Sequence, residues 1–218
     1  YWDRLLSRLS DDEEALSALE DLYTESEDWK NCALILQKRA RLSTDQFEQV
    51  AGWFRVSEVA GEKLDDAEMF QFALSTVLEI EPQNLDAMQQ LEESYHACGM
   101  WEEKVGLLLQ RLELSADVYE QGDLFESIAG LFEEKLGSVE SAFEVYIQAF
   151  EATKDEERFG LHLARLADSS EQWTQLVQMY ELILSGMGQG LDTVEMRLKT
   201  AHWSSEHLGD IDRAAVHY

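Results

Sequence analysis

The sequence has 218 residues, of which 45% are hydrophobic, one is proline and 12 are glycine. Its 45 acidic residues outnumber its 17 basic ones, which gives a formal net charge of -28 at pH 7. These numbers predict a folded, helix-rich chain and argue against general disorder, and the negative field argues against direct binding to nucleic acid or to an anionic membrane surface. The charge itself has two open explanations, namely solvated outer helix faces, or else a basic partner or a salty habitat.

The first ten residues, YWDRLLSRLS, have neither an initiator methionine nor the layout of a signal peptide. The two cysteines, Cys32 and Cys98, form no CxxC motif, which is typical of a reducing compartment. No apolar run approaches the 18 residues that a membrane-spanning helix needs. We therefore expect a cytoplasmic protein segment, with further repeats of its parent chain at both ends.

A repeat of 72 residues organises the chain. The stretch LEDLYTESEDW at 19–29 returns as LEESYHACGMW at 91–101, and Trp29, Trp101 and Trp173 follow one another at intervals of 72. A second series, KLDD, KLGS and HLGD, begins at positions 63, 135 and 207 with the same interval. Self-similarity at a fixed period is the signature of a solenoid.

Each repeat divides into units of two amphipathic helices. Leu91 and Tyr95 share one helical face before Gly99, and Trp101 and Val105 share another after it. Applying this pattern in chain order predicts hairpins at 13–43, 47–80, 85–115, 120–152, 156–185 and 191–218, the last incomplete, preceded at 1–10 by the end of an earlier repeat helix.

The repeated residues are predicted to be structural, because a tyrosine and a tryptophan bracket each hairpin turn while the residues between them vary. These predicted structural residues are Tyr23, Trp29, Tyr95, Gly99, Trp101, Gly137, Ala142, Tyr146, Trp173 and Gly209.

The unit EPQNLDAMQQLEESYHACGMWEEKVGLLLQRLEL resembles a tetratricopeptide repeat in its tyrosine, turn glycine and following aromatic residue. The segment AGLFEEKLGSVESAFEVYIQAFE resembles that family further, with a small-aromatic-small pattern at Ala142, Tyr146 and Ala149. The resemblance implies an all-α fold, a right-handed α-solenoid of about six antiparallel helical hairpins arranged as a 72-residue double repeat. It departs from the family at Glu20, Glu92, Lys104 and Leu176, where small residues are usual, so looser packing is expected there.

In this family the first helices line a concave groove that binds a peptide or helix of a partner protein. Carrying the pattern over places the following residues in the groove: Ser17, Asp21, Arg55, Val59, Gln89, Glu93, Ser127, Leu131, Leu161, Arg165, Lys199 and Trp203. Of these, Val59, Leu131, Leu161 and Trp203 are expected to form an exposed apolar strip. The alternative is that Trp203 belongs to the core.

Motifs for chemistry are weak. His202 and His207 are five residues apart, which separates them on a helix, and no histidine pairs with a cysteine at ligand spacing. The glycine-rich SGMGQG at 185–190 lacks the preceding strand and following Lys-Ser/Thr of a phosphate loop and is predicted to be a connection. We therefore expect no catalysis, metal or cofactor.

The sequence thus favours a non-catalytic scaffold for protein–protein interaction, with a protein or peptide partner that a basic segment would suit. Three alternatives stay open: an architectural spacer or self-assembling rod, a regulatory arm of a larger multidomain protein, and a half-a-TPR scaffold of the RNA-processing type, which shares an AFEVYIQAFE-like helix.

Overall fold

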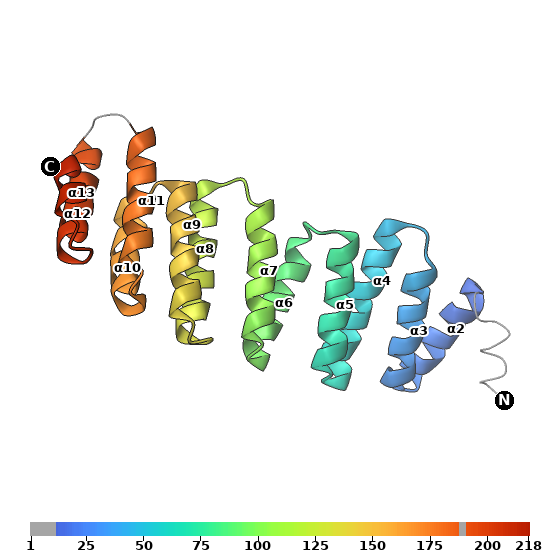
Figure 1. Ribbon diagram of the computed structural model, residues 1–218. Helices are drawn as coiled ribbons and strands as arrows, with labels where there is room; N and C mark the ends of the chain where they lie inside the picture. Colours follow the sequence, from blue (N-terminus) through green and yellow to red (C-terminus); the bar gives the residue numbers. More distant parts are fainter. Residues whose placement is uncertain (1–11, 188–190) are drawn as a thin grey trace. The chain divides into compact units, whose positions relative to one another are not determined.

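The computed structural model describes residues 12–187 and 191–218 (Figure 1). These residues form twelve α-helices and one short π-helix, and no strand occurs among them, so the predicted all-α class is confirmed. The helix predicted at 1–10, and residues 188–190 of the glycine-rich connection, lie outside the described residues.

The chain divides into two compact units, with the boundary between Met100 and Trp101. In the first unit each helix packs antiparallel against the next, and a π-helix, η1, extends α4 (Figure 1). The elements of this unit are α2 (Glu13–Glu25), α3 (Trp29–Leu42), α4 (Gln46–Val59), η1 (Ala60–Leu64), α5 (Ala67–Ile80) and α6 (Leu85–Cys98).

The second unit repeats this sequential, antiparallel packing. Its helices are α7 (Trp101–Leu114), α8 (Val118–Glu134), α9 (Val139–Thr153), α10 (Glu156–Ser170), α11 (Trp173–Gly186), α12 (Leu191–Glu206) and α13 (Ile211–His217). The pairs α8–α9, α10–α11 and α12–α13 fall in the ranges predicted for the last three hairpins. The predicted hairpin 85–115 is divided by the unit boundary, since α6 belongs to the first unit and α7 to the second.

Acidic residues start many of these helices. The carboxylate of Asp45 accepts hydrogen bonds from the backbone N–H groups of Phe47 and Glu48, which would otherwise lack partners in the first turn. The other aspartates that cap helices in this way are Asp12, Asp28, Asp66, Asp117, Asp155 and Asp210. Part of the large negative charge is therefore explained by helix capping.

The turns repeat in backbone conformation more faithfully than in sequence. The three predicted turn glycines, Gly99, Gly137 and Gly209, have φ values of 71°, 65° and 64°. The positions 72 residues away from them also have positive φ without being glycine: Glu27 at 55°, Asp65 at 53° and Glu171 at 57°. Such left-handed residues are strained for side chains with a Cβ, so the fold imposes this turn even where the sequence is unfavourable.

A cation or imidazole lies against the repeated tryptophan 34 residues before it. Each tryptophan begins the second helix of one hairpin, and its partner lies at the end of the first helix of the next. These pairs, called here the tryptophan clamps, are Trp29–Lys63 and Trp101–Lys135, each 5.5 Å from charge to ring centroid, and Trp173–His207, with ring centroids 3.7 Å apart. The clamps explain why this tryptophan recurs, because it joins consecutive hairpins.

Small and aromatic residues fill the contact between hairpins in the second unit. Ala142 and Ala149 on α9 are fully buried, and Tyr146 between them stacks on His162 of α10, with ring centroids 4.9 Å apart. The side chains that resemble the family pattern are therefore core residues here. Burial raises the pKa of the Tyr146 hydroxyl, and the carboxylates Glu126 and Glu133 raise it further.

Glu20 differs from the looser packing that was expected around it. Its side chain is buried, with 4% of the residue exposed, and it pairs with Arg39 of α3 and Arg55 of α4. The two guanidinium groups satisfy the carboxylate and fill the space beside it. Leu176 is also fully buried, so neither of these departures from the family leaves the side chain at a loose surface.

Candidate functional site

The predicted groove residues of the first unit lie on α2, α4 and α6. Asp21 is exposed, Val59 is half-buried, and Arg55 is occupied by the buried Glu20. Gln89 donates a hydrogen bond of 3.1 Å to Glu93 on the same exposed face of α6. Two clefts described in this unit are lined by other residues.

In the second unit two of the predicted residues are held by the fold. Leu131 is half-buried against the core. Arg165 donates two hydrogen bonds, of 2.6 and 2.8 Å, to the carboxylate of Glu133 on α8, and this pairing lowers the pKa of Glu133. Such a two-point contact positions α10 against α8.

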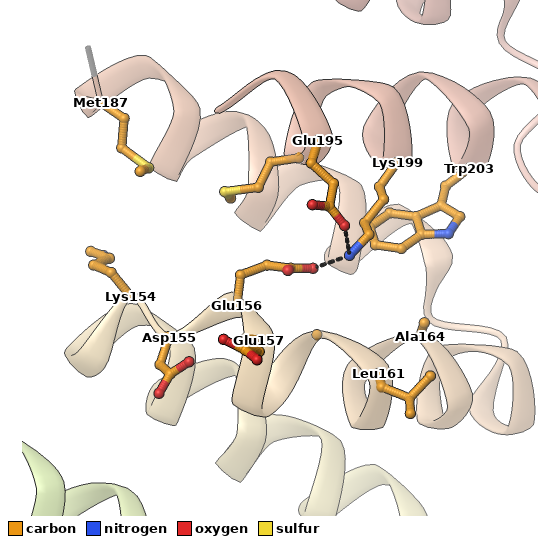
Figure 2. A pocket seen from close by; sticks show the side chains of 12 residues that line it. Lys154, Asp155, Glu156, Glu157, Leu161, Ala164, Met187, Glu195, Lys199 and Trp203 are labelled. Atoms are coloured by element: carbon orange, nitrogen blue, oxygen red, sulfur yellow. Dashed lines mark hydrogen bonds and ion pairs between the residues drawn. The ribbon is translucent and has the colours of Figure 1, made fainter. Parts of the chain in front are cut away.

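Leu161, Lys199 and Trp203 come together around one cleft between α10 and α12 (Figure 2). Its volume is about 770 Å³. The α10 side and its preceding turn contribute Lys154, Asp155, Glu156, Glu157, Gly160, Leu161 and Ala164, and the opposite side contributes Met187, Glu195, Met196, Lys199 and Trp203. We call this feature the α10–α12 cleft. It is the candidate functional site.

A network of hydrogen bonds and ion pairs lies in the cleft. Lys199 donates to Glu156 at 2.6 Å and is 3.2 Å from Glu195, and both contacts are visible in Figure 2. The hydroxyl of Tyr180, from α11, donates to the same oxygen of Glu156 at 3.3 Å. Glu156 is therefore satisfied from two neighbouring helices.

The titration of two groups follows from this network. Burial raises the pKa of the Tyr180 hydroxyl strongly, and the nearby charge of Glu156 adds to the effect. For Lys199, burial lowers the pKa, but the hydrogen bond and the charge of Glu156 outweigh it, so the pKa of the ammonium group is raised overall. Lys199 therefore stays a cation and Tyr180 stays a neutral donor at physiological pH.

Gly160 makes room for the carboxylate of Glu156. A Cβ at this position would lie 2.4 Å from an oxygen of Glu156 and 3.1 Å from the hydroxyl of Tyr180. Glycine inside a helix costs about 1 kcal/mol relative to alanine, and here the close approach of the two side chains requires it. The signal in the sequence was a glycine one helical turn after an acidic residue, and it was missed.

Trp203 is 7% exposed, so the expectation that it forms part of an exposed strip is wrong. Its ring lies edge-on to Tyr180, at 4.9 Å between centroids, and 5.8 Å from the ring of Trp173. These aromatic residues of α11 hold the indole inward, so that only part of it borders the cleft. The apolar surface that solvent reaches is instead Leu161, 80% exposed, together with half-buried Met187.

Carboxylates outnumber cations in the cleft. Its lining contains Asp155, Glu156, Glu157 and Glu195 against Lys154 and Lys199. Because Lys199 is shared between two of these carboxylates, its charge is already balanced. The open rim of the cleft is therefore negative.

Other classes of site lack support among the residues that the structure describes. Within them, no group of three or more His, Cys, Asp or Glu side chains is placed to hold a metal ion. No helix in the described ranges is both long and apolar enough to cross a bilayer. Cys32 and Cys98 are both free thiols.

Comparison with known proteins adds no closer assignment. No protein-family model matches this sequence, and no curated protein is significantly similar to it.

Proposed function

We propose that this chain is a non-catalytic protein-interaction module of the tetratricopeptide type, which binds a segment of a partner protein in the α10–α12 cleft. The proposal includes a right-handed superhelical arrangement of the hairpins, a cytoplasmic location and a parent protein with further repeats. It is supported by the 72-residue repeat and by the sequential antiparallel packing of the helices.

The observation that carries the proposal is the cleft itself. Leu161, Lys199 and Trp203 belong to the first helices of consecutive hairpins, where the resemblance predicts a groove, and all three line a cavity of about 770 Å³. Leu161 projects an apolar side chain that is 80% exposed. An exposed leucine beside a concave, partly apolar surface is typical of a protein-binding site.

The polar groups of the cleft favour binding over catalysis. Glu156 and Lys199 form an ion pair, and the hydroxyl of Tyr180 donates to Glu156, so these groups satisfy one another. A general base or nucleophile is usually held within reach of a reacting atom with its charge available. The spacer and regulatory-arm alternatives have no dedicated cleft residues, and they predict that substitutions in the cleft leave partner binding unchanged.

The test compares two exposed leucines of the second unit. A photo-crosslinking amino acid is introduced at Leu161, in the cleft, or at Leu182, which is 66% exposed on α11 and does not line it. In cells of the source organism, we expect a discrete crosslinked protein from position 161 that is absent from position 182. Ala164→Arg, which fills the cleft, should remove that product. Identical products from both positions, or a product from position 161 that persists with Ala164→Arg, would contradict the proposal.

A further inference from the structure

The charged and apolar parts of the α10–α12 cleft are separated along the helix axes. Asp155, Glu156 and Glu157 stand at the beginning of α10, and Leu161 and Ala164 follow one and two turns later. One helical turn corresponds to a rise of about 5.4 Å. The cleft therefore has an acidic end and an apolar end within the length of a short peptide.

Two carboxylates at the acidic end are open to a ligand. Glu157 is exposed, and the side chain of Glu195 is 70% exposed although it lies 3.2 Å from Lys199. Asp155 is partly occupied, because it accepts the backbone N–H of Arg158 as the cap of α10. Glu157 and Glu195, on opposite sides of the cleft, are thus the groups that a bound charge would meet.

The sign of that charge follows from Lys199. Its ammonium group is held by Glu156 and Glu195, so an anionic ligand would have to compete with both carboxylates for it. The same ligand would also face Glu157 and the net charge of -28 of the whole chain. A cation meets none of these obstacles, and the field of the protein attracts it.

The apolar end selects the neighbouring side chain of the ligand. Leu161 is exposed, Met187 and Ala164 are half-buried, and Trp203 forms the wall behind them. A leucine, isoleucine or methionine of a partner would cover this surface and gain the free energy of removing it from water. Met187 is a suitable contact, because its flexible thioether adapts to differently shaped side chains.

Building on the proposed function, we propose that the α10–α12 cleft binds a partner segment that carries a lysine or arginine and, about one helical turn away, an apolar side chain. The cation lies between Glu157 and Glu195, and the apolar side chain lies on Leu161 and Met187. The Glu156–Lys199 pair stays intact and keeps the two helices at the spacing that the ligand needs.

The probe for the test is a synthetic 14-residue helical peptide with lysine and leucine alternating at i, i+4 along one face. Its partner probe has glutamate in place of every lysine. Binding of each peptide to the full chain is measured by titration calorimetry at moderate ionic strength. Because any basic peptide is attracted to an acidic protein, the decisive comparison is between two double variants that lose the same charge.

The first variant is Glu157→Gln with Glu195→Gln, in the cleft. The second is Glu144→Gln with Glu151→Gln, two exposed positions on α9. We expect the lysine peptide to bind about tenfold more weakly to the cleft variant and within about twofold of the parent to the α9 variant. Leu161→Ser should also weaken it, and the glutamate peptide should not bind.

Equal weakening by both double variants would overturn the inference, since attraction would then be non-specific. Tighter binding of the glutamate peptide would also overturn it. Neither result would remove the proposed function, which is tested separately by crosslinking from position 161. A crosslinked partner whose contact segment lacks lysine and arginine would retain the function and reject the proposed chemistry.

Discussion

Two buried carboxylates, one in each unit, occupy the same place in their hairpins but have different surroundings. Glu20 on α2 is paired with Arg39 on the second helix of its own hairpin and with Arg55 on the first helix of the next. Glu156 on α10 contacts Tyr180 and Lys199, which belong to the corresponding helices, α11 and α12.

The partners decide whether the position is closed or open. Around Glu20, two guanidinium groups share one carboxylate, and their planar heads fill the space between the helices. Around Glu156, a single ammonium group is shared by two carboxylates, Glu156 and Glu195, and a cleft remains beside it. The same arrangement of helices thus gives a structural ion cluster in one unit and a binding surface in the other.

The largest effect that sharpens this comparison is expected at the wall of the cleft. Trp203 stands one turn after Lys199, as Val59 stands one turn after Arg55. Because Trp203 is buried against Tyr180, Trp203→Ala should lower the free energy of unfolding by about 3–5 kcal/mol. Val59→Ala, at a half-buried position, should cost about 1 kcal/mol. Denaturant unfolding of the two variants measures both, and similar losses would show that the two walls are alike.

The next effect separates the two carboxylates themselves. Glu20→Gln leaves Arg39 and Arg55 without a counter-charge, and we expect a loss of about 2–3 kcal/mol, less than for a fully buried pair because Arg55 is half exposed. Glu156→Gln should cost only about 1 kcal/mol, because Lys199 keeps Glu195 as a partner. The measurement is again denaturant unfolding. A greater loss for Glu156→Gln would reverse the assignment of the closed and open positions.

A smaller effect, of opposite sign, is expected at the turns of both units. Glu27→Gly and Glu171→Gly relieve a left-handed backbone at equivalent positions, so each should raise the free energy of unfolding by about 0.5–1 kcal/mol. Gly99→Ala, at the intermediate position of the same series, should lower it by a similar amount. Thermal melts of the three variants check this. Destabilisation by both glycine substitutions would mean that the glutamate side chains make favourable contacts that exceed the backbone strain.

The smallest effect concerns acid. A hydrogen bond from Arg165 lowers the pKa of Glu133, and one from Arg158 lowers that of Glu126. A carboxylate with a lowered folded pKa stabilises the fold above its unfolded value of about 4.3, and this contribution is lost as the pH falls through the folded value. Glu133→Gln should therefore make the loss of stability between pH 5 and pH 3 shallower, as measured by unfolding at each pH. The control is the neighbouring exposed Glu134→Gln, which should retain the parent's acid sensitivity.

Much of the fold was predictable from periodicity. The apolar spacing around Leu91 and Trp101 indicates paired helices without any long-range information, and the helices of the structure are packed in sequence order. The left-handed turns were predictable only where glycine marks them. At Glu27 and Glu171 the conformation is imposed by the closure of the hairpin, which local sequence does not express.

The candidate site was predictable in position but not in detail. The family pattern placed Leu161, Lys199 and Trp203 on first helices, and the structure puts them around one cleft. The burial of Trp203 depends on aromatic partners from α11, and the space at Gly160 exists because Glu156 folds back beside it. Both are tertiary relations between helices, and a pattern read along one helix does not contain them.

The tryptophan clamps have a consequence for how the chain opens. Each joins residues only 34 apart, so every junction between consecutive hairpins closes a short loop and can form without the rest of the chain. The junction at Trp173 has an imidazole where the other two have an ammonium group, and it holds α12 and α13 to the preceding hairpin. Hydrogen exchange in the second unit should therefore be graded, fastest in α12 and α13 and slowest around α8 and α9, whose core is the most aromatic.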